Sequence, residues 1–178
     1  MAPAGDVHRR VSDTAVGDEF PSHPSSILDG PDREVAVEAE FLAGVRAAAL
    51  ALPEAYEERA WVGTRWRVRG RTFGHLLTIE DGRPEGHARA AGTSGPCPVL
   101  TFRSSGLELE TLRQTGPPFF SAPWRGDEVG LRLADGVDWA EVGELLTDSY
   151  CLLAPKRLAA SVPRPEFDET ALRPPGPG

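Results

Sequence analysis

The chain has 178 residues, of which 40% are hydrophobic and 7% aromatic, a composition ordinary for a single soluble globular domain. Its formal net charge of -8 argues against a polycation of the kind usual among strong nucleic-acid binders. No run of about 18 apolar residues exists, and residues 1–30 lack the apolar stretch of about 7 to 15 residues that a secretory signal needs. We therefore expect a cytoplasmic protein that does not enter a membrane.

The two ends of the chain differ in composition from its middle. Residues 1–31 are rich in serine, proline, aspartate and glycine, and residues 163–178 are rich in proline, so neither end can bury enough apolar surface to offset the entropy of ordering. Residues 1–40 carry three basic and nine acidic residues, whereas residues 41–162 carry fourteen and fifteen. The sequence predicts a disordered acidic arm over 1–31, a nearly neutral domain over 32–162 and a flexible tail over 163–178.

The first predicted element is an amphipathic helix that begins at Asp32. Apolar residues recur in it every three or four positions, and Pro53 stops it. Two short strands follow over residues 65–69 and 72–80, joined by a tight turn at Gly70. The glycine-rich segment 83–98 predicts a long loop, and a third strand is expected over residues 99–103.

The hairpin carries the most distinctive feature of the chain, the segment RAWVGTRWRVRGR at residues 59–71. It contains five arginines and two tryptophans, and no acidic residue follows before Glu80. Because strand side chains alternate, an extended strand would place Trp66 and Val68 on one face. The opposite face would present Arg65, Arg67, Arg69 and Arg71. One face is thus predicted to pack and the other to meet anions.

Two capping boxes mark helix starts in the second half of the domain. Ser105 with Glu108 predicts a short helix over residues 106–113, and Asp138 with Glu141 predicts a long helix from about Trp139. Between them, the apolar and proline-broken segment GPPFFSAPW at 116–124 precedes an alternating strand around 129–133. The long helix would bury one apolar stripe, and a final turn would span 155–160.

Several of these segments together resemble the MmcQ/YjbR family over about residues 36–162. The resemblance is carried by LPEAYEE, WRVRGRTFGHL, VLTFRSSGLELETL, PPFFSAPW and VDWAEVGELLTDSYCLLAPKRL. Its most specific parts are the LPEAYEE link after the first helix, the hairpin with a basic residue before Phe73, the strand entry at Trp124, and the SYxLxxxKxL ending that runs from Ser149 to Leu158.

The resemblance implies an α+β fold in which a single antiparallel sheet is covered on one face by helices. The implied order is helix, three strands, helix, two strands, helix, and the architecture is similar to frataxin-like and secretion-chaperone-like folds. Family members are commonly described as DNA-binding proteins with a double-wing arrangement. This sequence departs from many members at Thr101, where they have lysine, and at Phe119 and Phe120, where they have a histidine between the proline and the tryptophan.

The leading functional prediction is a non-enzymatic protein that binds DNA weakly and in a salt-sensitive manner through the basic hairpin. Guanidinium groups match phosphate oxygens in geometry and charge. The candidate residues are Arg65, Arg67, Arg69, Arg71, Lys156 and Arg157. The competing interpretation of the arginines is a solvated strand face that is balanced by Glu57, Glu58 and other nearby acids.

The alternative function is a protein- or small-ligand-binding scaffold that uses the aromatic region at 117–124. Its candidate patch comprises Trp61, Phe119, Phe120 and Trp124. The phenylalanines and Trp124 could instead seal the edge of the sheet. Trp61 and Trp66 could stack on unpaired bases, although the alternation around Trp66 favours packing in the core.

The sequence gives no indication of catalysis or of a cofactor. It contains no GxSxG, GxxxxGK[ST] or strand-associated GxGxxG motif. His75 has no partner at metal-ligand spacing, and neither Cys97 nor Cys151 has one. We expect no enzymatic activity, no cofactor and no bound metal.

Overall fold

The computed structural model describes residues 31–163, with side chains from residue 38 onward. Residues 1–30 and 164–178, which make up nearly all of the predicted acidic arm and Pro-rich tail, lie outside the described part of the chain. No helix in the described part is long and apolar enough to cross a membrane.

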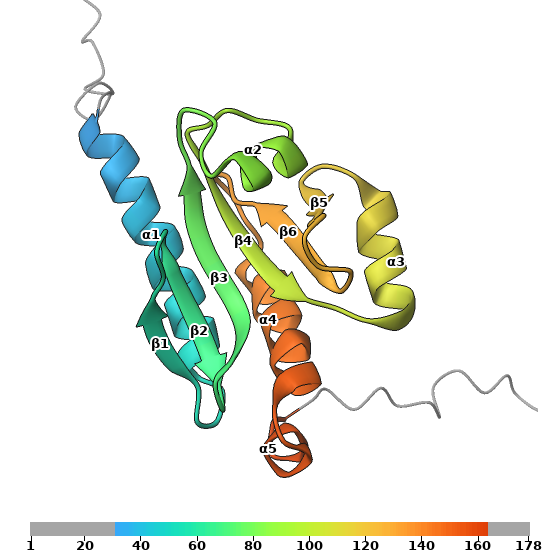
Figure 1. Cartoon of the computed structure of the whole chain (residues 1–178). Coiled ribbons are helices and arrows are strands. Elements are labelled where there is room, and N and C mark those ends of the chain that lie inside the picture. The colour runs from blue at the N-terminus through green and yellow to red at the C-terminus, as the bar shows by residue number, and fades with distance from the viewer. Residues whose placement is uncertain (1–30, 164–178) are drawn as a thin grey trace, which may run out of the picture.

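The structure is an α+β fold built on one antiparallel sheet with the strand order β1-β2-β3-β4-β6-β5 (Figure 1). The strands are β1 (Tyr56–Arg59), β2 (Thr64–Val68), β3 (Arg71–Ile79), β4 (Cys97–Arg103), β5 (Phe119–Ser121) and β6 (Glu128–Arg132). The helices are α1 (Pro31–Leu50), α2 (Glu85–Ala91), α3 (Gly106–Thr115), α4 (Trp139–Leu153) and α5 (Lys156–Ala160). The predicted fold class is confirmed, with β1 and α2 as additional elements.

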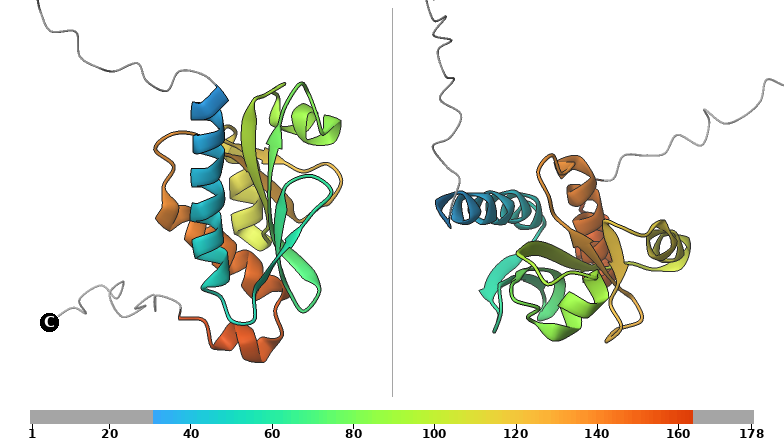
Figure 2. Two further views of the ribbon diagram at one scale, coloured as in Figure 1. Left: turned by 90° about the vertical axis from the view of Figure 1, so that its left-hand side faces the viewer. Right: turned by 90° about the horizontal axis from the view of Figure 1, so that it is seen from above.

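One face of the sheet is covered by α1 and α4 and holds the main hydrophobic core (Figure 2). Trp66 and Val68 are fully buried there, as the alternation of the strand predicts, and Phe73 is fully buried beside them. The ring of Phe73 meets the buried ring of Tyr150 edge-on at 5.4 Å. The Tyr150 hydroxyl donates to the carbonyl of Pro53 at 2.6 Å, so α4 is fastened to the segment that follows α1.

The opposite face, which we call the open face, is covered only in part, by α2. Ala88 and Ala91 of this helix pack on Ile79 and Val99, and Phe120 completes this second apolar cluster. The prediction of a loop over residues 83–98 is therefore wrong for residues 85–91. The helix has only two buried positions, which is too short a pattern for a helical period to emerge from the sequence.

The two predicted capping boxes have different outcomes. Asp138 caps α4, because its Oδ1 accepts hydrogen bonds from the backbone N–H groups of Ala140 at 2.9 Å and Glu141 at 3.3 Å. Ser105 precedes α3 but makes no capping hydrogen bond with its side chain. The hydroxyl of Ser104 instead donates to Glu108 at 2.6 Å. The predicted start of this helix after Ser105 is thus confirmed, whereas the capping hydrogen bond expected from the Ser105 side chain does not form.

Strand β1 was not predicted, because its sequence YEER reads as a polar link. It forms the edge of the sheet and pairs with β2 in the register Glu58↔Arg65 and Glu57↔Trp66. Charged residues are typical of edge strands, where they oppose pairing with a second chain. This register places two carboxylates beside the arginine-rich strand.

The close contact between β5 and β6 yields a prediction for Gly130. The Phe120 ring lies over this glycine, and an added Cβ would come within 2.0 Å of Phe120 Cζ. Replacing Gly130 with alanine should therefore overpack the site and lower the free energy of unfolding by about 1–3 kcal/mol. Urea unfolding measures this change. Gly126→Ala is the matched control, since a Cβ there meets nothing within 4 Å. Equal midpoints for the two variants would contradict the prediction.

Candidate functional site

The part of the open face that α2 leaves uncovered contains a cavity of about 510 Å³, which we call the basic cavity. It lies between the β2–β3 hairpin and the segment that leads into β6, and extends to the end of α4 at Leu153. Its charged lining residues are four arginines and one carboxylate, Arg67, Arg71, Arg103, Arg125 and Glu128, and Thr72, His75 and Thr101 add neutral polar groups.

Strand register brings several of these side chains onto the same face. Arg67 lies opposite Thr72 in β3, and Arg103 of β4 lies opposite Glu128 of β6. Their neighbours along each strand, Trp66 and Phe102, are buried on the covered face. Because strand side chains alternate between the two faces, the arginine that follows each buried aromatic residue is directed to the open face.

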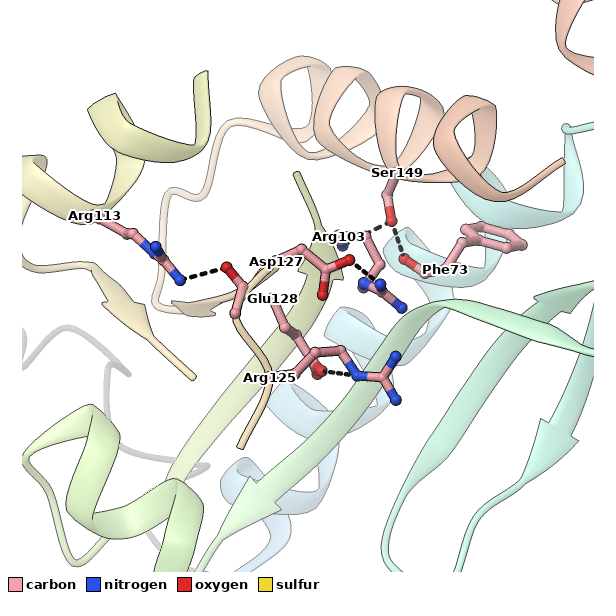
Figure 3. A network of polar contacts seen from close by, with 8 residues as sticks. Phe73, Arg103, Arg113, Arg125, Asp127, Glu128 and Ser149 are labelled. Carbon is pink, nitrogen blue, oxygen red and sulfur yellow. Dashed lines mark hydrogen bonds and ion pairs between the residues drawn. The ribbon is translucent and has the colours of Figure 1, made fainter. Parts of the chain in front are cut away.

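A serine of α4 ends the pairing between the two central strands. The regular register of β3 with β4 stops at Gly74 and Phe102, and a continued ladder would next join Phe73 to Arg103. The Ser149 hydroxyl takes that place, donating to the Phe73 carbonyl at 2.6 Å and accepting from the Arg103 N–H at 2.8 Å (Figure 3). Ser149 is fully buried, so both backbone groups are satisfied without water.

The segment before β6 and the first residue of β6 supply two acidic partners of the cavity. Arg103 pairs with Asp127, and Arg125 lies 3.6 Å from Glu128 (Figure 3). Arg113 of α3 donates to the carbonyl of Gly126 at 2.6 Å, which holds the same segment from the other side. Burial lowers the pKa of the Arg103 guanidinium from its ordinary value, and the like charge of Arg125 lowers it further. Two cations therefore lie close together in the cavity.

The predicted row of four arginines on one strand face does not form. Arg65 and Arg67 lie on the open face, but Arg69 is in the turn with φ 48 and Arg71 begins the next strand. Arg71 is opposite Val68, whose side chain is buried on the covered face. The alternation of side chains between the two faces ends at the turn around Gly70. The face on which Arg71 lies therefore could not be extrapolated from that of Arg67.

Carboxylates neutralise much of the arginine-rich hairpin. Glu58 of β1 lies 3.1 Å from Arg65 and 2.8 Å from Arg67, and these two partners hold its pKa below the ordinary value. Arg69 pairs with Glu54 at 2.6 Å, and Arg71 donates to the carbonyl of Leu153 at 3.2 Å. The interpretation of a balanced, solvated face is thus correct for Arg65 and Arg69, with the acids supplied by the segment that precedes the hairpin.

Glu57, the other acid of β1, does not pair with the hairpin arginines as the sequence analysis considered. Glu57 pairs with Arg46 of α1 at 2.7 Å and accepts from Trp66 Nε1 at 3.2 Å. The bond with Arg46 is the main cause of its lowered pKa. Glu57 thus connects α1 to the core tryptophan and does not balance the arginines of the hairpin.

Two further basic candidates, Lys156 and Arg157, are exposed on the first turn of α5. This helix lies at the same end of the molecule as the β2–β3 turn (Figure 1). The hydrogen bond from Arg71 to Leu153 joins the two regions, because Leu153 ends α4 just before α5. Lys156 and Arg157 themselves do not line the basic cavity.

The four aromatic residues predicted as a partner patch do not form one surface. Phe119 and Phe120 are both buried, in the two different core clusters on opposite faces of the sheet. Trp61 is fully exposed in the loop between β1 and β2, and Trp124 is 43% exposed. The prediction of an exposed patch is therefore wrong for Phe119 and Phe120, which fill the core, while both tryptophans remain accessible.

The histidines and cysteines form no obvious chemical site. His75 Nε2 lies 2.7 Å from the Val62 carbonyl, and the His75 ring faces that of His87 at 6.4 Å. Burial lowers the pKa of His87, and His75 lowers it further. Within residues 31–163, no three histidine, cysteine, aspartate or glutamate residues are grouped as metal ligands. Cys97 and Cys151 are both free thiols.

Sequence reasoning missed Arg103, Arg125 and Ser149. The two arginines come from segments that lie far from the hairpin in the chain, and only the sheet order brings them near Arg67. Ser149 did carry a signal. It is a polar residue within the apolar stripe of α4, at three and four residues from Leu146 and Leu145.

The fold and the basic cavity define an α+β protein whose open sheet face is the candidate binding surface. The family model described as YjbR matches residues 50–152. The chain therefore belongs to the YjbR family, and the predicted resemblance is confirmed. No curated protein matches this chain.

Two crystal structures are similar to this chain. A Deinococcus radiodurans protein with a DUF419 domain is 20% identical, with a TM-score of 0.47, over 62% of this chain and 76% of its own. A protein from Pseudomonas syringae is 15% identical, with a TM-score of 0.48, over 65% of this chain and 97% of its own.

The Ser149 bridge yields a second prediction. Ser149→Ala removes the only group that joins the Phe73 carbonyl to the Arg103 N–H within the described residues. Leaving two buried backbone groups unpaired should lower the free energy of unfolding by about 1–3 kcal/mol. Denaturant unfolding measures the loss, with Thr111→Ala as the control, since that exposed hydroxyl bonds only to its own helix. An unchanged stability would mean that the strands close and pair directly.

Proposed function

We propose that the chain is a non-enzymatic, cytoplasmic protein that binds DNA weakly through the basic cavity and the adjoining hairpin. The observation that carries this proposal is an excess of cations around one recess. Within the described part of the chain, five arginines share three carboxylates: Arg65 and Arg67 share Glu58, Arg103 has Asp127, Arg125 has Glu128, and Arg71 donates to a carbonyl.

The arginines have hydrogen-bonding capacity left for an anion. The Nε atoms of Arg67 and Arg103 are buried and have no acceptor among the described residues; Arg113, outside the cavity, has the third such atom. A buried donor without a partner is costly, so a side-chain rearrangement on binding that brings an acceptor to it is stabilising. Phosphate oxygens are acceptors of the right charge, and guanidinium groups bind them in bidentate geometry.

The existing ion pairs reduce the affinity of the arginines for DNA, but a phosphate can still replace a carboxylate. Arg125 is 54% exposed and its distance of 3.6 Å to Glu128 is long, so a phosphate displaces this carboxylate at small cost. Contacts to four phosphates would give a slope of log affinity against log salt of about -3.6 for duplex DNA. The interaction is therefore modest and strongly dependent on salt.

The structure gives less support to the alternative, a scaffold that binds a protein or small ligand at residues 117–124. Two of its four aromatic residues, Phe119 and Phe120, are buried in the core. A binding role in preference to a catalytic one follows from the sequence, which has none of the catalytic motifs considered.

Charge reversal at the cavity tests the proposal. Arg125→Glu places a carboxylate beside Arg103, and should weaken DNA binding at low salt by about tenfold or more, since a cation–phosphate contact becomes a repulsion. Fluorescence anisotropy of a labelled oligonucleotide at two salt concentrations measures the change. Arg89→Glu alters the net charge by the same amount on an exposed position of α2, outside the cavity. Equal losses in both variants, or no salt-sensitive binding by the wild type, would refute the proposal.

Removal of a competing carboxylate should have the opposite effect. Glu58→Gln leaves the Arg65 and Arg67 guanidiniums without their shared anion, so DNA affinity at low salt should rise several-fold. The same titration measures the gain. Glu141→Gln, on the first turn of α4, changes the net charge equally and serves as the control. A Glu58→Gln variant that binds no better than this control would show that the hairpin arginines do not contact DNA.

A further inference from the structure

We propose that the open face accepts single-stranded DNA in preference to duplex, with Trp124 as the platform on which one base stacks beside the cations of the basic cavity. This inference rests on the proposed function and names the form of its ligand. The juxtaposition that carries it is an exposed tryptophan that directly precedes Arg125, one of the arginines that line the recess.

The depth of the arginines favours a thin ligand. The side chains of Arg103 and Arg67 are only 16% and 24% exposed, and they lie in a cavity bordered by the hairpin and the segment before β6. Duplex DNA is read by elements that protrude into its grooves, such as a helix or a two-stranded ribbon. A recess does not protrude into a groove of duplex DNA. A single strand is thin and flexible enough for its phosphates or bases to enter the recess.

Trp124 is held so that part of its surface stays accessible. Its ring packs on the imidazole of His87 at 4.3 Å between centroids, and its six-membered ring lies close to Gly86 of α2. These contacts fix the indole against one side, yet 43% of the residue remains exposed. Base–aromatic stacking needs such a supported ring with a free surface, and it operates with any base.

The position of Trp124 also connects it to the cations. The next residue, Arg125, lines the basic cavity, as does His75, whose ring faces that of His87. A base on Trp124 therefore brings its sugar–phosphate chain to the mouth of the cavity. A positively charged groove combined with an aromatic platform is the usual arrangement in proteins that bind single strands.

Trp61 offers an internal comparison, because it is fully exposed but lies in different surroundings. The surface around it includes Glu80 and Glu85 with Arg83, so acids outnumber the basic residue there. A phosphate chain would be repelled from this position. The two exposed tryptophans are thus similar in chemistry and opposite in local charge, which makes Trp61→Ala the matched control.

The experiment compares a single strand of about 16 nucleotides with the duplex that it forms with its complement, using the full chain at one low salt concentration. Trp124→Ala should weaken binding of the single strand by about tenfold, the effect of losing one stacked base, and should change duplex binding by less than about twofold. Trp61→Ala should leave both affinities unchanged. Trp124→Phe should keep most of the single-strand affinity, because phenylalanine also stacks, but lose most of the quenching of tryptophan fluorescence, because the indole that the base covers is gone.

The outcomes separate this inference from the proposed function. Equal weakening of single-strand and duplex binding in Trp124→Ala, or a tighter wild-type complex with duplex, overturns the preference for single strands while salt-sensitive DNA binding stands. An unchanged single-strand affinity in Trp124→Ala overturns the stacking role. A wild-type protein that binds neither DNA form overturns both proposals. Circular dichroism and thermal unfolding of each variant confirm that a loss of binding does not come from a loss of fold.

Discussion

The insertion of one hydroxyl between two strands shapes the part of the molecule that contains the basic cavity. Ser149 occupies the position at which the β3–β4 ladder would continue, and it joins α4 to both strands through backbone groups. The strand ends are thereby kept apart without an unpaired N–H or carbonyl. Arg103 lies at the point of separation, so the same interaction that supports the core also places a partly buried cation in the open-face cavity.

Carboxylates of the protein occupy positions near the cavity arginines where an external anion would bind. Among the described residues, each cavity arginine except Arg71 has a carboxylate near it, supplied by β1, by the segment before β6 or by the first residue of β6. Such pairing stabilises a cluster of like charges that would otherwise repel. An external anion must therefore bind the arginines more favourably than these carboxylates do in order to displace them. A protein with a net charge of -8 can in this way present a local cationic surface without a strong general attraction for polyanions.

Local patterns in the sequence predicted the core better than the site. The alternation through Trp66 and Val68 identified the buried face of β2, and Asp138 identified the start of α4. The same alternation gave the wrong face for Arg71, because the chain reverses direction at the turn before it and Arg71 pairs with Val68. Arg103 and Arg125 were not recognised, since no local pattern shows that segments distant in the chain meet at one cavity. Helix α2 was missed because two alanines are too few to reveal a period.

The two edges of the sheet have a consequence for the behaviour of the protein in solution. The outermost strands are β1, with four residues of which three are charged, and β5, with three residues. A sheet with one partly uncovered face is a template for self-association when its edges are long and apolar. Here neither edge offers enough unpaired backbone to recruit a second chain, so the open face can remain accessible to a ligand without making the protein prone to fibrous aggregation.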